Sequence, residues 1–263
     1  MLMHNRSRKY PKGRLWAKVL SAVLFWAFIV LCGLLTVNLY QTYTVRKAHQ
    51  ELKASKNATE IKDDWSNGML DKNEDYKGWL TIYGTGVDHP VVQGKDNDEY
   101  VRLAFDKTWN IAGTPFLDEK CVSPNGGNLI IYGHMMNDNT MFGGLKQYKN
   151  AQFFKEHTAA LWEDEEGEHY YSLFAAMVVP GSASIEGFID LQQFCGELNE
   201  EETEEMLVQI KEKAFTYKSP EIIQGSDKHL QDDYLFVVTC DYSLNNGRLV
   251  LVFRNVTGER PAS

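Results

Sequence analysis

The 263-residue sequence predicts a mainly β domain, built as a barrel or a sandwich, with helices added to it. From Trp79 onward, short apolar runs alternate with turn residues over about 180 residues, a texture typical of all-β domains. Gly, Asn, Pro and Ser mark the turns at 84–86, 123–127 and 245–247. One polar segment with a helical pattern interrupts the runs. The apolar runs predict strands at 79–83, 90–93, 114–118, 128–134, 169–180, 234–240 and 248–256.

The charge of the chain is divided unevenly. Residues 1–18 hold six Lys or Arg residues and no acid. The whole chain has a net charge of −9, so the residues after 18 have a net charge of −9 − 6 = −15. Nucleic-acid binding needs clustered basic side chains, and an acidic body argues against it. The composition favours a soluble domain behind a short basic tail.

Residues 19–45 contain no charged side chain and predict a membrane anchor. About 20 apolar residues span a bilayer as a helix. Trp16 and Tyr40 flank the run where aromatic rings favour the interface, and the preceding basic block predicts a cytoplasmic N-terminus. A cleaved signal peptide is the alternative, but the run exceeds the usual apolar core and no small-x-small cleavage site stands out. A buried core helix fits poorly, because the run is apolar all round.

The residues after the anchor would then face the outside of the cell. Residues 46–75 predict a helical juxtamembrane segment, in which Ile61, Trp65 and Met69 form a stripe at helical spacing. We expect this stripe to dock onto the body, since a free stalk would leave Trp65 in water. Residues 76–258 are the predicted catalytic domain.

A further helix is predicted at 199–215. Asn199 precedes three glutamates, a pattern typical of an N-cap with a capping box at Glu202. Lys211 and Lys213 suit the other end of the helix dipole. A buried stripe is expected at Met206, Ile210 and Ala214. The acidic face is interpreted as solvated surface rather than as a metal site.

Cysteine usage predicts a free thiol outside the membrane. Cys32 lies in the anchor, which leaves Cys121, Cys195 and Cys240. An odd count leaves at least one cysteine unpaired. No Cys or His spacing indicates zinc, and no cofactor is expected.

Three chemically capable residues stand at predicted strand tips. Cys240 ends the 234–240 run, Arg248 begins the next run after a turn, and His134 ends the 128–134 run. A hairpin would bring Cys240 and Arg248 together, and a cation favours the thiolate over the thiol. His134 could move protons, and Arg248 could donate hydrogen bonds to an oxyanion. Together they predict a minimal acyl-transfer site.

Each of these residues also has a plain structural interpretation. Most free cysteines are small buried hydrophobes. A single His is more often structural, and Arg248 could form a surface salt bridge. His134 is preferred among the seven histidines because it combines a strand tip, an adjacent glycine and a polar loop at 137–140.

The sequence around these residues resembles the sortases, a family of cell-surface cysteine transpeptidases, and within them class B. Thr239-Cys240 is followed eight residues later by Arg248. The resemblance extends from about Asp75 to Val256, and the helix at 199–215 falls where class B members insert one. Class C is less similar, since the sequence shows neither the aspartate-aromatic lid motif of that class nor a second membrane span after the barrel. Further similar segments are 78–82, 89–97 with Tyr100, 128–134, and 140–145 with Phe153-Phe154.

Two departures from the family pattern are modest. Val237-Val238 precede Thr239 where many members have a Leu-x pair, which affects the pocket more than the chemistry. His89 stands where the family often has a tyrosine, so His89 is interpreted as incidental to catalysis.

The resemblance implies a closed β-barrel of seven to eight strands and a two-step reaction. Cys240 would attack the carbonyl of a Thr in the C-terminal sorting signal of a secreted protein, and a peptidoglycan amine would resolve the thioester. His134 would transfer protons, and Arg248 would stabilise the oxyanion. The family pattern also suggests substrate contacts for Asn97, Val101, Thr239 and Asp241. The expected partners are sorting-signal proteins, wall-peptide amines and the membrane, with no metal or cofactor.

Two other functions are consistent with parts of the sequence. A papain-like cysteine hydrolase would carry its nucleophile at a helix start, whereas Cys240 ends an apolar strand. A non-catalytic anchored β-barrel that binds a partner predicts a buried and inert Cys240.

Overall fold

A computed structural model describes residues 12–58, 68–121, 127–219 and 233–257. The chain divides into two compact units, Met1–Lys47 and Ala48–Ser263. The first unit consists of helix α1 (Lys12–Ala58) up to Lys47, and the last turns of α1 belong to the second unit. The prediction of a basic tail at 1–18 falls partly on residues 1–11, which lie outside the described residues.

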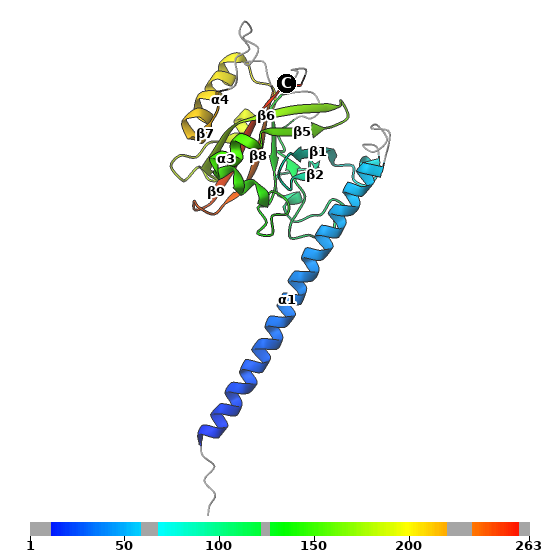
Figure 1. Ribbon diagram of the computed structural model, residues 1–263, viewed down its shortest axis with the longest axis vertical. Coiled ribbons are helices and arrows are strands. Elements are labelled where there is room, and N and C mark those ends of the chain that lie inside the picture. The colour runs from blue at the N-terminus through cyan, green and yellow to red at the C-terminus, as the bar shows by residue number, and fades with distance from the viewer. Residues whose placement is uncertain (1–11, 59–67, 122–126, 220–232, 258–263) are drawn as a thin grey trace, which may run out of the picture. The chain divides into compact units, whose positions relative to one another are not determined.

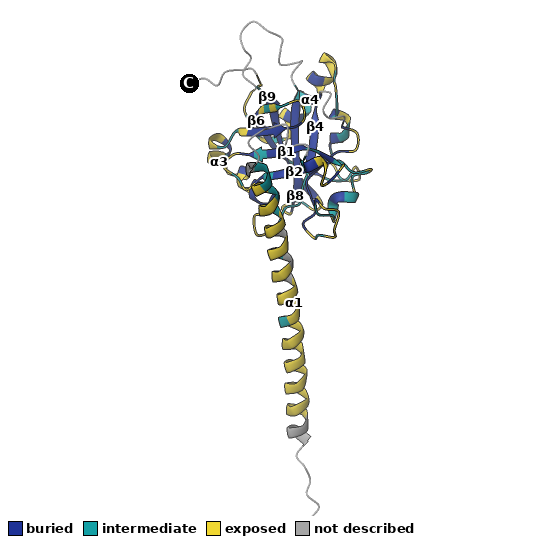
Figure 2. Cartoon of the chain, turned by 90° about the vertical axis from the view of Figure 1, so that its right-hand side faces the viewer, coloured by how far each residue is buried: buried dark blue, intermediate teal, exposed yellow. Residues whose placement is uncertain are grey.

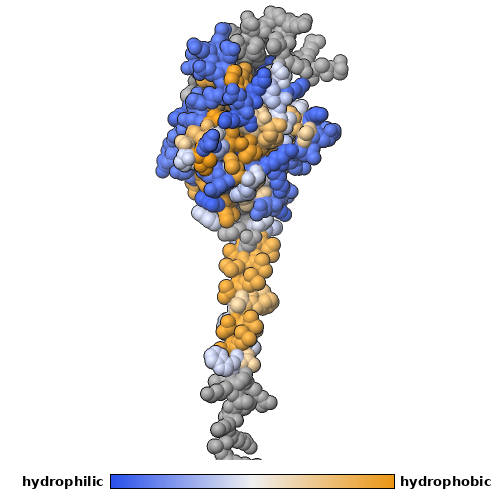
Figure 3. Space-filling model, turned by 90° about the vertical axis from the view of Figure 1, so that its left-hand side faces the viewer, coloured by the Kyte–Doolittle hydropathy of each residue, from blue (hydrophilic) through white to orange (hydrophobic). Residues whose placement is uncertain are grey.

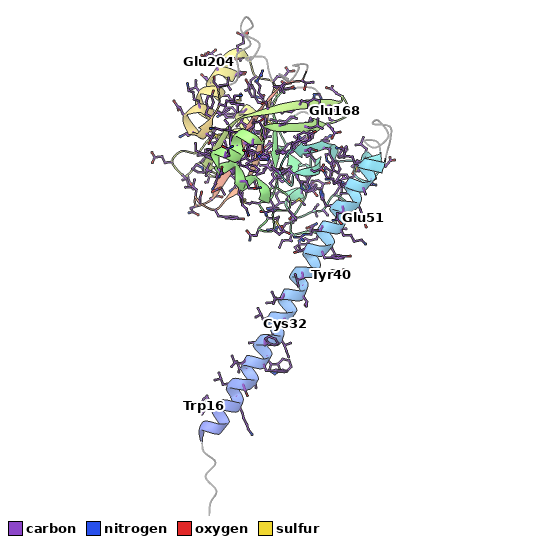
Figure 4. The ribbon with its side chains drawn as sticks, viewed as in Figure 1. Trp16, Cys32, Tyr40, Glu51, Glu168 and Glu204 are labelled. Carbon is purple, nitrogen blue, oxygen red and sulfur yellow. A yellow bond between two sulfur atoms is a disulfide. The ribbon has the colours of Figure 1, made fainter. Side chains whose placement is uncertain are left out.

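Helix α1 includes the whole apolar run predicted as an anchor. Its side chains between Trp16 and Tyr43 are largely exposed and apolar (Figure 3). Trp16, Cys32 and Tyr40 all project from this one helix (Figure 4). By length and composition α1 could cross a membrane.

Within the described residues, nine strands form one sheet, and Figure 1 labels most of them. Their order in the sheet is β5-β1-β2-β3-β4-β8-β9-β6-β7. An additional pairing of β5 with β6 closes eight of these strands into a barrel, and β7 continues from β6 outside the ring. The strands are β1 (Tyr76–Ile82), β2 (Asp88–Val92), β3 (Phe116–Leu117), β4 (Leu129–Tyr132), β5 (Ala159–Glu163), β6 (Glu168–Pro180), β7 (Ala214–Tyr217), β8 (Tyr234–Asp241) and β9 (Gly247–Asn255).

The predicted mainly β fold with a closed barrel is confirmed, and all seven predicted strands are present. Two strands, β5 and β7, were not predicted from the sequence. β7 begins at the residue directly after a helix and so presents no separate apolar run, whereas the short apolar run of β5 was not recognised as a strand.

The core fills the barrel and continues onto its outer face. β8 is buried over almost its whole length, as Figure 2 shows for the strands generally. A strand covered on both faces reads as a continuous apolar run, which explains the sequence of β8. Each fully buried Val, Leu or Phe side chain contributes about 1.5–3 kcal/mol relative to an exposed one. The fully buried side chains include Leu80, Ile131, Phe142, Val237, Leu251 and Phe253.

The connection from β6 to β7 carries two helices. η3 (Leu191–Phe194) is followed by α4 (Glu200–Lys213). The predicted capping box is present, with Asn199 and Glu202 bonding each other's backbone N–H groups. Met206 and Ile210 are buried as expected, but Ala214 is only partly buried because the helix has ended and β7 begins there. Glu204 on α4 is exposed (Figure 4).

A disulfide joins Cys121, after β3, to Cys195, after η3. Cys240 is a free thiol. The prediction of a free thiol among the three cysteines outside the anchor is confirmed, and the disulfide attaches the β6–β7 connection to the barrel.

The last turns of α1, which belong to the second unit, contact the barrel through polar side chains. His49 Nδ1 lies 3.1 Å from His89 Nδ1, Lys53 pairs with Asp88, and Lys56 pairs with Glu163. These three positions recur at helical spacing. The predicted stripe is described only in part: Met69 is buried, whereas Ile61 and Trp65 lie outside the described residues.

Candidate functional site

Three adjacent strands bring the predicted catalytic residues to one edge of the sheet. In the antiparallel pairing of β8 with β9, Cys240 lies directly opposite Arg248. β4 runs parallel to β8 on its other side, with Tyr132 opposite Val238. A backbone hydrogen bond from Gly133 to Val238 continues this alignment, so two further residues bring His134 level with Cys240. The three residues therefore lie at one edge of the sheet, where β4 and β8 end and β9 begins.

The local packing around His134 fixes its position. A Cβ on Gly133 would lie 2.6 Å from the Phe142 ring, so the residue before His134 must be small. The carbonyl of His134 accepts a hydrogen bond from the Phe142 N–H at 3.0 Å. On the ring, Nε2 lies 2.9 Å from the carbonyl oxygen of Val101. If Nε2 carries the proton and donates this bond, Nδ1 is the nitrogen free to accept one.

Cys240 is partly exposed, unlike the rest of its strand. The residues from Tyr234 to Thr239 are all buried, and Cys240 is where β8 reaches the surface. The sulfur is accessible to a ligand, which a structural core cysteine would not be.

Arg248 is also partly exposed, and its guanidinium is held by the β8–β9 turn. Nη1 donates to Asn246 Oδ1 at 3.1 Å and to the Gly247 carbonyl at 3.0 Å. A Cβ on Gly181 would lie 2.9 Å from the guanidinium carbon, so the β6–β7 connection passes close to it. The cation is thus held next to Cys240 by groups that leave some of its five donors available.

Of the four residues predicted to contact substrate, two are partly exposed and two are buried. Asn97 lies two residues before η1 (Glu99–Val101), and Val101, the last residue of η1, contacts His134 through its carbonyl. Asn97 donates to Asp118 Oδ2 at 3.0 Å and accepts from the Glu119 N–H at 2.9 Å. Both residues are partly exposed beside the strand tips.

Thr239 and Asp241 are both buried, in contrast to Cys240 between them. Successive strand residues face opposite sides, so neither shares the face of Cys240. Asp241 forms an ion pair with Lys149 and accepts hydrogen bonds from Ser243. Burial raises the pKa of Asp241, but the hydrogen bonds from Lys149 and Ser243 outweigh it and hold the pKa below its ordinary value. The placement favours a structural role for both residues.

Asp118 adjoins the site and is not among the residues that the sequence predicts for it. Asp118 follows β3 and is fully buried. Its carboxylate accepts hydrogen bonds from Asn97, from the Tyr132 hydroxyl at 2.9 Å, and from Gln192 Nε2 at 3.1 and 2.9 Å. The sequence does place Asp118 at the end of a predicted strand, as it does Cys240 and His134. The hydrogen-bond partners of Asp118 come from distant parts of the chain, so its contacts could not be predicted.

Within the described residues, no group of three or more His, Cys, Asp or Glu side chains is arranged to hold a metal ion.

Comparison with known proteins finds similar sequences among the sortase B proteins. No protein-family model matches the chain. It is 29% identical over 163 residues to sortase B of Staphylococcus aureus, covering 59% of this chain and 66% of that protein. It is 29% identical over 202 residues to sortase B of Listeria monocytogenes, covering 75% of this chain and 76% of that protein.

Solved structures agree with the sequence relatives. The X-ray structure of Clostridium perfringens sortase B is similar with a TM-score of 0.62 and 27% sequence identity, covering 72% of this chain and 98% of that one. Both comparisons point to the class suggested by the motifs around Cys240. In sequence and in fold the chain is therefore similar to the class B sortases, which are cysteine transpeptidases.

Proposed function

We propose that the protein is a membrane-anchored sortase that cuts a C-terminal sorting signal after a Thr residue and joins the new acyl end to a peptidoglycan amine. The observation that carries this proposal is the strand register. Parallel pairing of β4 with β8 and antiparallel pairing of β8 with β9 bring His134, Cys240 and Arg248 to one edge. A nucleophile, a proton carrier and a fixed cation are the groups that acyl transfer needs.

In the first step, Cys240 Sγ as thiolate attacks the carbonyl carbon of the Thr residue. The tetrahedral oxyanion collapses to a thioester as the C–N bond breaks. His134, as imidazolium, donates its proton to the departing amine, because an amide nitrogen leaves only when protonated. The downstream peptide departs and His134 is left neutral.

In the second step, an amine attacks the thioester carbonyl. Neutral His134 accepts the proton that the amine loses, and the C–S bond breaks to return the thiolate. A new amide replaces the one that was cut, so the enzyme regains its starting protonation state. The Val101 carbonyl near Nε2 orients the ring in both steps.

Arg248 is proposed to stabilise the oxyanion in both steps. It lies opposite Cys240 across the β8–β9 ladder, and arginine stays protonated at any physiological pH. Removing a single oxyanion donor typically costs about 10²–10³ in kcat.

The anchor and the orientation of the chain are further parts of the proposal. We infer that residues 1–18 are a cytoplasmic tail, residues 19–45 span the membrane, residues 46–75 form a helical juxtamembrane segment, and residues 76–258 are the extracellular catalytic domain. Anchoring would hold the enzyme at the membrane face where secreted substrates and wall precursors meet. Confinement raises the effective concentration of both and so compensates for a slow chemical step.

The two alternatives fit less well. A papain-like hydrolase carries its nucleophile at the start of a helix, whereas Cys240 is the penultimate residue of strand β8. A purely binding barrel has no need for a thiol that is exposed only at the strand tip.

The test is a peptide library containing internal Thr residues, incubated with the full chain in detergent micelles, with and without an amine acceptor. Cleavage at Thr that needs Cys240 and His134, with ligation when the amine is present, is the expected result. Hydrolysis that the amine never diverts would favour the papain-like alternative. No cleavage, or cleavage that survives Cys240→Ala, would contradict the proposal.

A further inference from the structure

The Asp118 carboxylate joins three segments that approach the strand tips from different parts of the chain. Asn97 belongs to the loop before η1, Tyr132 ends β4, and Gln192 belongs to η3 in the β6–β7 connection. The Lys120 N–H supplies a further bond at 3.0 Å. All four donors are neutral. A buried carboxylate is costly unless hydrogen bonds satisfy it, so this one holds its partners strongly.

Two of these contacts lead directly to His134. Tyr132 precedes His134 by two residues on the same strand, so its contact with Asp118 fixes the main chain that carries the imidazole. Asn97 stands four residues before Val101, whose carbonyl lies 2.9 Å from His134 Nε2. Asp118 therefore supports both the backbone and the ring of His134.

The third contact leads toward Cys240. Two residues after Gln192 is Phe194, whose ring stacks on Phe236 of β8 with 5.9 Å between the ring centroids. Phe236 and Cys240 are four residues apart on one strand and so share a face. The η3 segment therefore covers the same face of β8 on which Cys240 reaches the surface.

The β6–β7 connection is already attached to the barrel without Asp118. The Cys121–Cys195 disulfide and the Phe194–Phe236 stack both hold it. Gln93 also fixes the turn after β3, with its Nε2 donating to the Asp118 and Cys121 carbonyls at 2.8 and 2.7 Å. The Asp118 carboxylate is therefore not needed to attach the β6–β7 connection or the turn after β3, and its hydrogen bonds instead orient these segments.

We propose that Asp118 is a positioning residue for the acyl donor. It sets the separation between the Asn97 loop and η3, so that an extended peptide lying between them presents its carbonyl to Cys240 while His134 is correctly oriented. This inference rests on the proposed transpeptidase function. Displacing a reacting group by about 1 Å can cost around 10²-fold in rate, so loss of the carboxylate should lower kcat/KM.

The test compares Asp118→Asn with the unaltered full chain in detergent micelles. The substitution keeps the shape but turns one acceptor into a donor that faces other donors. We expect kcat/KM for a cleavable peptide to fall by about tenfold or more, mainly through KM. Alkylation of Cys240 by iodoacetamide should change less than twofold, because a small reagent does not need the groove. Glu205→Gln, an exposed change on α4, is the matched control and should leave both values unchanged.

A compensating change separates positioning from general support of the fold. Adding Gln192→Glu to Asp118→Asn restores an acceptor facing a donor and should recover part of the lost kcat/KM. If Asp118→Asn does not fold, Gln192→Ala removes the same contact from the partly exposed side and should raise KM alone.

Three outcomes would overturn the proposal. One is kcat/KM within twofold of the unaltered chain. Another is a loss matched by equal losses in Cys240 alkylation and in the unfolding midpoint, which would show that Asp118 only supports the fold. An inactive unaltered chain would overturn the proposed function itself, and this inference with it.

Discussion

His134 and Arg248 each follow a glycine that the local packing requires. Gly133 allows Phe142 to pack against the backbone before His134, and Gly247 lets the turn close before Arg248. A Cβ on Gly247 would lie 2.6 Å from the Asp241 carbonyl oxygen, so that tight turn needs a glycine. These two glycines therefore help to place His134 and Arg248 at the edge of the sheet.

Replacing Arg248 with lysine tests whether the guanidinium or only its charge is needed. Lysine keeps the charge but lacks the planar set of donors. We expect Arg248→Lys to lower kcat by about 10²-fold, within the range for loss of an oxyanion donor. Steady-state kinetics on a cleavable peptide measures this, with Arg102→Lys on the exposed surface as the control. Equal kcat values for Arg248→Lys and the unaltered chain would exclude an oxyanion role.

His89 predicts a loss of stability in acid. Burial lowers its pKa to about 3, and His49 at 3.1 Å adds to the shift. The unfolded chain has the ordinary value near 6.5, so it binds the proton more readily. His89 therefore contributes full stability above about pH 6.5 and loses it as the pH falls toward 3.

Urea denaturation between pH 4.5 and 8 measures this effect in the His89→Gln variant. Its stability should fall less steeply below pH 6.5 than that of the unaltered chain. His169→Gln is the matched control of opposite sign, because the hydrogen bond that His169 donates to the Asp164 carboxylate raises the pKa of His169. Its stabilising effect is present at low pH and lost as the pH rises through the raised pKa. Identical pH profiles for the unaltered chain and His89→Gln would contradict this account.

At the scale of elements, the sequence predicts best the parts whose pattern is local. The helix at Glu200–Lys213 carries its own capping box, and β8 and β9 are long apolar runs, so each is recognisable alone. β7 could not be found because it continues directly from α4 without a turn signal. The Asp118 contacts could not be found because Asn97, Tyr132 and Gln192 lie 21, 14 and 74 residues away in sequence.

The Cys121–Cys195 disulfide should be a major stabilising connection. It closes a sequence separation of 74 residues, and loops of this size typically gain about 2–4 kcal/mol from the cross-link. We expect the Cys121→Ser, Cys195→Ser double variant to lose about that much free energy of unfolding, measured with urea. The same change in a Cys240→Ala background controls for thiol exchange. A loss below about 0.5 kcal/mol would mean that other contacts already hold the β6–β7 connection.

At the scale of the whole molecule, the chain combines an apolar helix with a barrel whose reactive edge is partly exposed. The sequence predicts a helical segment after the anchor, and α1 continues as far as Ala58. Within the second unit, His49, Lys53 and Lys56 contact the barrel through polar groups, which an apolar pattern does not signal. Paired polar contacts of this sort depend on partners that only the folded barrel supplies.

The anchor predicts a specific membrane behaviour. We expect the chain to stay in the membrane fraction after alkaline carbonate washing and to keep its N-terminal residues, as read from the intact mass. Trypsin added to protoplasts should remove the catalytic domain from the outer face. A soluble product lacking residues 1–45 would instead indicate a cleaved signal peptide.

The most direct test of the central claim is the mass of Cys240 during turnover. The full chain is mixed with a Thr-containing sorting peptide without acceptor, quenched in acid and digested for mass spectrometry. We predict an acyl adduct on Cys240 that ends in Thr and disappears when an amine acceptor is added, as the ligated product appears. His134→Ala should accumulate little adduct. Peptide cleavage with no adduct on Cys240, or an adduct that the amine never resolves, would contradict the assignment of this site to transpeptidation.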